Sequence, residues 1–255
     1  MRPTIKQTAQ MQEITKIYGI HALKEAIDAA MAVEKVYVQE DSGHPKIQSL
    51  LKECAAQGAT ISYVPLEKLN KLSKARNHQG IVATISPIDF IDIEVLIDQA
   101  IEQTPTPIFV LLDQISDVRN FGAIVRSAVA AGAQGIIIQK KGGAPVNADA
   151  IKTSAGALFK IPVCKVDHIK DAILYLQAAN ISLIAATEKG SQSIYSTDFT
   201  SGFALIMGSE GRGINPSVLA MVDQKVNIPI SDQIESLNVS VASAVILFEA
   251  IRQRQ

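Results

Sequence analysis

The residues best suited to chemistry lie in three polar segments, each of which follows an apolar run. The first segment, residues 113–127, offers Asp117 or Asn120 as a helix cap, then Gly122, which permits a close backbone approach, and then Arg126. Because a guanidinium presents a fixed fork of donors to phosphate oxygens, this segment is a candidate clamp for a phosphate or a ribose. The alternative is an ordinary capped helix whose arginines face solvent.

The second segment, residues 207–213, is rich in glycine. Its glycines, Gly208, Gly211 and Gly213, permit positive φ and let a ligand lie against the main chain. The spacing G-x-x-G-x-G differs from the GxGxxG of dinucleotide-binding folds and from the P-loop pattern, and Ser209 lacks the GxSxG context of a nucleophile elbow. The segment is therefore either a binding loop of another kind or a plain glycine-rich turn.

The third segment, residues 227–242, breaks a strand at Pro229 and then opens a helix that carries Ser236, Asn238 and Ser240 at its start. Each of these side chains can bond a backbone group or a ligand. Capping explains one of them. The remaining polar groups at the mouth of an apolar helix are therefore candidates for ligand binding.

Apolar runs that would position these segments recur from Ile108 onward. They are continuous rather than alternating, as expected for parallel strands that are covered on both faces. Their ranges are 108–112, 135–138, 181–185, 203–207 and 226–228. Because helical stretches intervene, the pattern predicts an α/β fold with a parallel sheet. Ligands bind outside the carboxyl ends of such strands, so the loops after these runs are where a site should lie.

The C-terminal stretch is predicted to be a helix with a strongly apolar face. The residues at helical spacing are Leu237, Val241, Val245, Phe248 and Ile251. This face must pack on the sheet or on another subunit.

The 255 residues predict two domains joined by a linker. After a flexible N-terminus at 1–13, residues 14–86 alternate short helical and strand patterns and form a small α/β unit. Residues 87–106 carry five acidic residues and no basic one, and a Thr-Pro repeat closes the segment. This composition predicts a linker with one solvated helix. The second domain then spans 107–255.

Composition and charge exclude several classes of protein. With 47% apolar residues and a net charge of −1, the chain is neither disordered nor strongly basic, so a polyanion must be held by local patches. Cys54 and Cys164 stand apart without His neighbours at ligand spacing, which indicates buried free thiols rather than a metal site or a disulfide framework. The N-terminus lacks the apolar core of a signal peptide, and we expect a soluble cytoplasmic protein.

Two basic clusters are candidates for phosphate contacts. The first lies in the small domain and comprises Lys68, Lys71, Lys74 and Arg76, followed by His78. The second is formed by Lys140 and Lys141 after a predicted strand. The alternatives are a solvated helix face and a mobile loop. Since the aromatic residues fall mostly in apolar runs, no aromatic platform for stacking single-stranded bases is expected.

Taken together, the three segments resemble the three motifs of the SpoU family of RNA ribose 2′-O-methyltransferases, the TrmH-like branch of the SPOUT superfamily. The resemblance extends from about residue 108 to 254. The matching positions are Asn120, Gly122 and Arg126 in the first motif, Gly208, Glu210 and Gly211 in the second, and Ile228, Pro229, Ser236, Leu237, Asn238 and Ser240 in the third. Residues 18–23 and 77–83 resemble the substrate-binding domain of the same family. One departure bears on the cofactor pocket, because Ile230, Ser231 and Asp232 stand where the family commonly has Met-x-Gly.

The resemblance implies a fold and a reaction. The fold is a parallel-sheet SPOUT catalytic domain with a C-terminal trefoil knot, preceded by an L30e-like α/β substrate-binding domain, in a homodimer. The reaction is methylation of a ribose 2′-hydroxyl by S-adenosyl-L-methionine (AdoMet) without a metal, on a guanosine of large-subunit (23S) ribosomal RNA. A tRNA guanosine methyltransferase and a non-catalytic RNA-binding protein on the same fold are the alternatives.

The resemblance also implies roles for individual residues. Arg126 is expected at the ribose, where it holds the adjacent phosphate and stabilises the developing alkoxide; deprotonation of the hydroxyl through Arg126 is the alternative. The residues expected to position it and the hydroxyl are Asn120, Glu210, Ser236 and Asn238. The adenosine is expected to lie against Thr187, Gly208, Ile228 and Leu237. The expected RNA-binding residues are Lys68, Lys71, Lys74, Arg76, Lys140 and Lys141. Asp113 and Asp117 are expected to be structural, because carboxylates beside phosphates are unfavourable.

Overall fold

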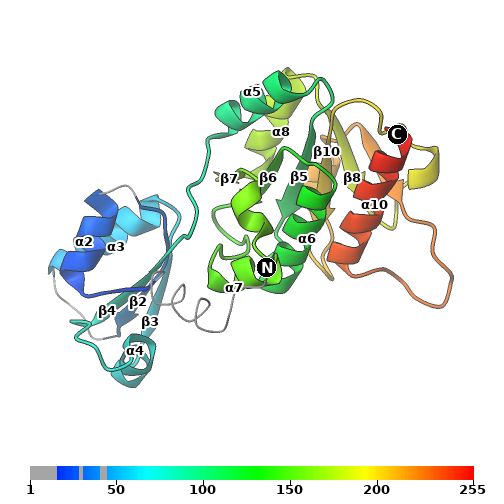
Figure 1. Ribbon diagram of the computed structural model, residues 1–255. Coiled ribbons are helices and arrows are strands. Elements are labelled where there is room, and N and C mark those ends of the chain that lie inside the picture. Colours follow the sequence, from blue (N-terminus) through cyan, green and yellow to red (C-terminus); the bar gives the residue numbers. More distant parts are fainter. Residues whose placement is uncertain (1–15, 29–30, 41–44) are drawn as a thin grey trace. The chain divides into compact units, whose positions relative to one another are not determined.

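The protein is described by a computed structural model that places residues 16–28, 31–40 and 45–255. The chain divides into two compact units with the main boundary between Asp89 and Phe90, and residues 145–148 group with the first unit. Each unit has a sheet and an apolar core of its own (Figure 1). The flexible stretch predicted at 1–13 lies outside the described residues.

The first unit is built on a four-stranded sheet in the order β1-β4-β2-β3. Its strands are β1 (Lys16–Tyr18), β2 (Val33–Gln39), β3 (Thr60–Val64) and β4 (Ile81–Ile85). β2 and β3 pair in parallel, whereas β4 runs antiparallel to both β1 and β2. The unit is therefore a small α/β domain with a mixed sheet.

The two faces of this sheet are covered unequally. On one face, α2 (Ile20–Asp28) and α3 (Pro45–Ala56) bury an apolar core to which Val36, Val38 and Ile81 contribute. Alternation along the strands puts these three side chains on the same side. This is the larger core of the unit.

Among the described residues, the other face carries one short helix, α4 (Leu66–Ser73). Leu69 of this helix packs with Val64 and Val82 of the sheet in a small cluster. A loop with left-handed backbone at Lys74, among other positions, then leads from the helix towards β4.

The second unit contains a seven-stranded sheet in the order β7-β6-β5-β10-β8-β11-β9, and every adjacent pair is parallel. The strands are β5 (Ile108–Asp113), β6 (Gly135–Gln139), β7 (Val163–Val166), β8 (Ser182–Ala186), β9 (Gln192–Ser193), β10 (Phe203–Gly208) and β11 (Gln224–Asn227). The predicted α/β fold with a parallel sheet is confirmed, because all five apolar runs are strands. The sequence did not predict β7, in which Lys165 interrupts the four-residue apolar run, or β9, which has two residues.

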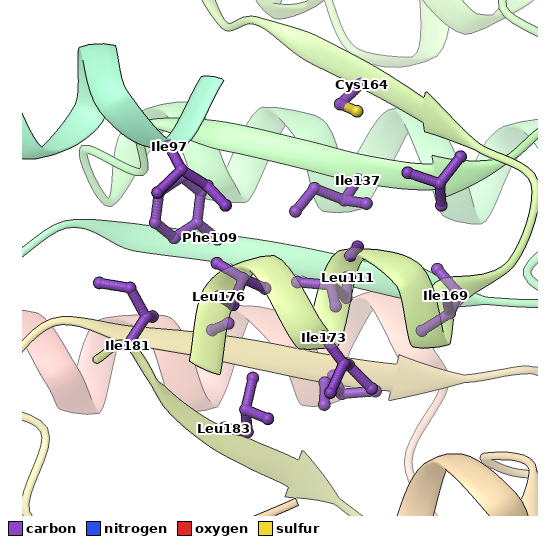
Figure 2. Close-up of a cluster of buried hydrophobic side chains, with 14 of the residues drawn as sticks. Ile97, Phe109, Leu111, Ile137, Cys164, Ile169, Ile173, Leu176, Ile181 and Leu183 are labelled. Atoms are coloured by element: carbon purple, nitrogen blue, oxygen red, sulfur yellow. The ribbon is translucent and has the colours of Figure 1, made fainter. Parts of the chain in front are cut away.

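Helices cover both faces of the second sheet (Figure 1). They are α5 (Ile93–Gln103), α6 (Val118–Ala130), α7 (Ala148–Thr153), α8 (Ile169–Ala178), α9 (Pro216–Leu219) and α10 (Val239–Gln253), with short 3₁₀ turns at Ala157–Lys160 and Ile194–Ser196. α5 and α8 pack on one face. Figure 2 shows Ile173 and Leu176 of α8 over Leu111 and Ile137 of the central strands. α6 and α10 pack together on the other face.

The helix predicted to be solvated within the linker at 87–106 is part of the second unit instead. Leu96 and Ile97 of α5 are 1% and 4% exposed and belong to the core over the sheet. A Cβ on Gly135 would lie 2.7 Å from a methyl carbon of Leu96, so the helix sits directly on β6. The prediction was wrong because the helix is amphipathic: its acidic residues lie on the outer face, and its apolar residues pack on the sheet.

The buried side of α10 differs from the predicted apolar stripe. Val241 and Phe248 of that stripe are 49% and 51% exposed, whereas Ile246, Leu247 and Ala250 are buried. The helix is apolar nearly all round, so helical spacing alone defines more than one apolar stripe. The exposed part of the predicted stripe does not pack on the sheet.

Candidate active site

A cavity of about 670 Å³ opens where β8, β10 and β11 end. Its wall includes Thr187, Gly208, Ile228 and Leu237, the four residues predicted to contact the adenosine. They come from three separate loops, as expected for a site at the carboxyl edge of a parallel sheet. Ile230, which marks the departure from the family pattern, also lines the cavity.

The glycine-rich loop forms one wall of this cavity by folding back on itself. Gly213 N–H donates to the Ser209 carbonyl at 2.8 Å, and Gly211 and Gly213 adopt φ of 84° and 67°. Gly208 has no room for a side chain, because a Cβ there would lie 2.2 Å from the carbonyl carbon of Gly213. The missing side chain at Gly208 therefore lets the loop pack on its own backbone, and Glu210 and Arg212 of the same loop line the cavity with the glycines.

Asp113 anchors this loop from the neighbouring strand. It is the register partner of Gly208 and its side chain is 1% exposed. The Asn215 N–H donates to Asp113 Oδ2 at 2.7 Å across 102 residues of sequence. Burial raises the pKa of this carboxyl, and the Asn215 hydrogen bond opposes that rise. Asp113 is thus a buried side chain that holds the loop, in line with the structural role expected of it.

Asp117 is also structural. It is the N-cap of α6, and its Oδ1 accepts the N–H groups of Arg119 and Asn120 at 2.9 and 2.8 Å. Of the two candidate caps, Asp117 therefore fills that position and leaves the Asn120 side chain free for another contact.

Side chains from all three motifs meet in one hydrogen-bond network beside the cavity. Glu210 Oε1 accepts from Asn120 Nδ2 at 3.1 Å and from Asn238 Nδ2 at 2.5 Å. Asn238 Nδ2 also lies 3.0 Å from Asn120 Oδ1. Asn238 and Glu210 line the cavity, so the network faces the site at which a cofactor would lie.

The remaining two predicted catalytic residues lie differently. Ser236 is on the wall of the cavity. Arg126 is exposed on α6, does not line the cavity, and within the described part of the chain forms no hydrogen bond or ion pair. Gly122, on the same helix, is required by packing, since a Cβ there would clash with the Thr153 side chain and the Ser154 nitrogen.

The wall of the cavity contains charged residues that the sequence analysis did not single out. Lys189 and Glu188 follow Thr187, Arg212 lies within the glycine-rich loop, and Glu235 precedes Ser236. They could have been found from the sequence, because each is a neighbour of a predicted site residue on the same loop. The structure identifies them because it brings those loops to one cavity.

The predicted RNA-binding cations lie at the surface. Lys68 and Lys71 are exposed on α4, and Lys74 and Arg76 are exposed in the following loop. In the second unit Lys141 is exposed, but Lys140 forms an ion pair with Asp167 at 2.9 Å. His78, from the same window, is 7% exposed and packs inside the first unit.

The two thiols, Cys54 and Cys164, are free and buried, as the sequence predicts. Burial raises their pKa to about 11 and about 12. Residues 16–28, 31–40 and 45–255 contain no group of three or more His, Cys, Asp or Glu side chains that could hold a metal ion. Over the same residues no helix is long and apolar enough to cross a membrane.

Two family models match the chain. The model of the SpoU rRNA Methylase family covers residues 107–248. The chain belongs to this family. A second model, for RNA 2′-O ribose methyltransferase substrate binding, covers residues 16–90. The SpoU family match includes all three motifs, and the second match covers the small unit.

Curated SpoU relatives match over almost the whole chain. The 23S rRNA (guanosine-2′-O-)-methyltransferase RlmB of Photobacterium profundum is 34% identical over 241 residues, which are 94% of this chain and 98% of that protein. The protein of the same name from Escherichia coli K12 is 32% identical over 93% of this chain and 98% of its own.

Solved SpoU structures share the fold. AviRb from Streptomyces viridochromogenes, in complex with AdoMet, is 24% identical with a TM-score of 0.60, over 94% of this chain and 90% of its own. The A. aeolicus TrmH/SpoU tRNA modifying enzyme is 28% identical with a TM-score of 0.53, over 64% of this chain and 84% of its own.

Proposed function

We propose that the protein transfers a methyl group from AdoMet to the ribose 2′-hydroxyl of a guanosine in 23S ribosomal RNA. The 23S rRNA guanosine enzymes of P. profundum and E. coli are similar over both units of this chain. The observation that carries the proposal is the cavity at the strand ends, beside which the Asn120–Glu210–Asn238 network joins all three motifs.

The residues around the cavity fit AdoMet. Gly208, Gly211 and Gly213 of the glycine-rich loop line the cavity and leave main-chain groups there that a nucleoside can approach. Thr187, Ile228 and Leu237 complete the adenosine site from the other two loops. AdoMet supplies a methyl group on a positively charged sulfur, whose neutral thioether is a good leaving group.

The chain's own residues orient and activate the ribose. Glu210, with Oε1 held by two amides, accepts a hydrogen bond from the 2′-hydroxyl through Oε2 and takes its proton as the new O–CH3 bond forms and the S–CH3 bond breaks. Ser236 adds a hydroxyl on the same wall. Arg126 holds the adjacent phosphate and stabilises the negative charge that develops on the 2′-oxygen.

The finer features of the fold belong to the same proposal. We place a trefoil knot in the C-terminal half, supported by a sheet in which β10 lies between β5 and β8, and an L30e-like substrate-binding role in residues 14–86. Exposed Val241 and Phe248 support a homodimer through α10. An enzyme of ribosomal RNA with these properties acts in the cytoplasm.

A tRNA guanosine is the second candidate substrate, because the A. aeolicus enzyme named as tRNA-modifying has the same fold. That match covers 64% of this chain, whereas the 23S rRNA enzymes match over 93% or more. This difference in coverage favours ribosomal RNA.

The test is incubation of the purified protein with methyl-labelled AdoMet and, separately, deproteinised 23S rRNA, partly assembled large subunits and tRNA. We expect label in a ribosomal RNA sample. Label in tRNA alone would favour the second candidate. No label in any sample, with RNA still bound, would identify a non-catalytic RNA-binding protein.

A further inference from the structure

The α4 side of the small sheet carries a surface that the sequence analysis did not predict. We name it the lysine–tyrosine face, and it consists of Lys16, Tyr18, Lys35 and Tyr37. Both lysines are register partners of Thr84, and both tyrosines are register partners of Val82. Since alternate residues of a strand point to the same side, the four side chains lie on one face in two rows.

This face is opposite the main core of the unit. Val82 belongs to the small cluster under α4, and Tyr18 and Tyr37 pack against that cluster. The next residues along the strands, Val36 and Ala83, belong to the core under α2 and α3. The tyrosine rings are therefore half-buried and fixed in place, with their lysine neighbours further along the same strands.

Each tyrosine holds a cation. Lys35 Nζ lies 4.9 Å from the centroid of the Tyr37 ring, and Arg76 Cζ lies 5.5 Å from that of Tyr18. A cation over an aromatic ring is attracted by the negative face of the π-system. Because Arg76 belongs to the loop after α4, this contact joins the predicted basic cluster to the lysine–tyrosine face.

The loop that carries Arg76 is itself fixed. His78 Nδ1 accepts the Gly80 N–H at 3.1 Å, so the imidazole proton is on Nε2, which donates to Asn70 Oδ1 at 3.0 Å. These two bonds tie the loop to α4 and to the start of β4. The cation at Arg76 is thus held in position before any ligand arrives.

The charge around this face is positive. The four strands contain one acidic residue, Glu34, and its side chain is almost fully buried. Exposed Lys68 and Lys71 on α4 extend the positive surface, and Glu67 is the acidic residue of that helix. A row of cations with few carboxylates suits a chain of phosphates.

We infer that the lysine–tyrosine face binds the phosphodiester backbone of the RNA substrate. Lys16, Lys35 and Arg76 contact phosphates, and Tyr18 and Tyr37 are positioning residues that hold the cations above the sheet. Lys16 on β1 and Lys35 on β2 lie on either side of β4, so their backbones are about 10 Å apart. This spacing lets the two lysines contact separate phosphates. This inference rests on the proposed function, because it takes the substrate to be RNA.

The test uses the full-length protein and deproteinised 23S rRNA, with filter binding measured over a series of KCl concentrations. For Lys16→Ala/Lys35→Ala we expect the Kd to rise about tenfold and the slope of log Kd against log salt to fall by about 1.5. The matched control, Lys46→Ala/Lys52→Ala, removes two exposed lysines from α3 on the opposite face and should bind as wild type. Equal losses in both variants, or none in the first, would overturn the inference.

The role of the rings is tested at Tyr37. Tyr37→Phe keeps an aromatic face under Lys35 and should retain RNA affinity, whereas Tyr37→Leu should raise the Kd severalfold. Circular dichroism confirms that both variants fold. If Tyr37→Leu binds RNA as tightly as Tyr37→Phe, the ring does not position Lys35.

AdoMet titration by calorimetry separates this inference from the proposed function. All these variants should bind AdoMet as wild type does, because the substitutions lie outside the second unit. A wild-type protein that binds 23S rRNA through this face yet transfers no methyl group would refute the proposed reaction and leave the inference standing.

Discussion

The side chain of Asn238 shows how one residue can serve both fold and site. Its Oδ1 accepts the N–H groups of Ser240 and Val241 and so caps α10. With the oxygen committed to the helix, the amide nitrogen must point to Glu210 and Asn120. The cap therefore fixes which atom faces the carboxylate.

Asn238→Asp separates these two roles. The aspartate retains the cap but loses the donor and places a second carboxylate beside Glu210. We expect methyl transfer to fall about 100-fold with little change in Tm. Asn238→Ala should in addition lose about 1 kcal/mol of stability. The account of the network is wrong if Asn238→Asp transfers methyl groups at the wild-type rate.

Arg126 is predicted to act on the RNA and not on the cofactor. We expect Arg126→Ala to lose methyl transfer by at least 100-fold while its AdoMet affinity stays unchanged, because the arginine does not line the cavity. Transfer assays and calorimetry measure the two properties. Arg119→Ala, an exposed arginine on the same helix, is the matched control and should be active. Full activity in Arg126→Ala contradicts the role.

Among the elements, β5 holds the glycine-rich loop in place. Asp113 ends β5, and its bond to the Asn215 N–H holds the far end of the loop that starts at Gly208. The glycine-rich loop lines the cavity, so the shape of the cavity depends on where this loop is held.

Asp113→Ala should therefore weaken AdoMet binding about tenfold, because the partly buried hydrogen bond from the Asn215 N–H loses its acceptor. Asp113→Asn keeps an acceptor oxygen at the same place and should bind AdoMet nearly as wild type does. Calorimetric titration compares the two. Equal affinity in Asp113→Ala and wild type would show that another contact holds the loop.

How far the sequence predicts these elements depends on the range of the interactions. Runs of apolar residues predict the buried strands locally, whereas the assignment of Gly208 and Leu237 to a cofactor site came from the resemblance to the SpoU motifs. The contact of Glu210 with Asn120 spans 90 residues, and no local pattern gives its geometry. The pairing of Lys140 with Asp167 and the burial of Leu96 likewise depend on tertiary packing.

At the scale of the whole molecule, the C-terminal end of α10 closes the second unit. Arg254 donates to the carbonyls of Phe199 and Thr106 at 2.8 and 2.7 Å, and Gln253 donates to that of Thr197. One turn earlier, the nearly buried Glu249 accepts from Arg252 and Gln253. The helix end is thus tied to segments that enter the sheet.

Glu249 should make stability depend on acid. Hydrogen bonds from Arg252 and Gln253 lower the pKa of Glu249 to about 2, from an ordinary value of 4.5. A carboxyl whose pKa is lowered by folding stabilises the folded state when the pH is above its pKa in the unfolded chain. This contribution is lost as the pH falls from about 4.5 towards 2. In urea unfolding at pH 7, 5 and 3, wild type should lose more stability than Glu249→Gln. If both proteins lose the same free energy of unfolding between pH 7 and pH 3, the Glu249 carboxylate contributes nothing to this pH dependence.

The proposed homodimer predicts a further property of the whole molecule. Val241→Asp/Phe248→Asp should convert a dimer into a monomer of 27.3 kDa in light scattering, since it places charge on the exposed stripe of α10. Leu174→Asp, at a residue 58% exposed on α8, should remain dimeric. A wild-type protein that is monomeric at micromolar concentration contradicts the proposed interface.

The central claim is that this chain methylates a guanosine ribose in 23S rRNA. The most direct measurement is mass spectrometry of nucleosides from 23S rRNA treated with the protein and AdoMet, followed by mapping of the alkali-resistant bond. The account predicts 2′-O-methylguanosine at a defined position, absent when Arg126→Ala replaces wild type. Methylation of a base, of another ribose nucleoside, or of tRNA alone would contradict it.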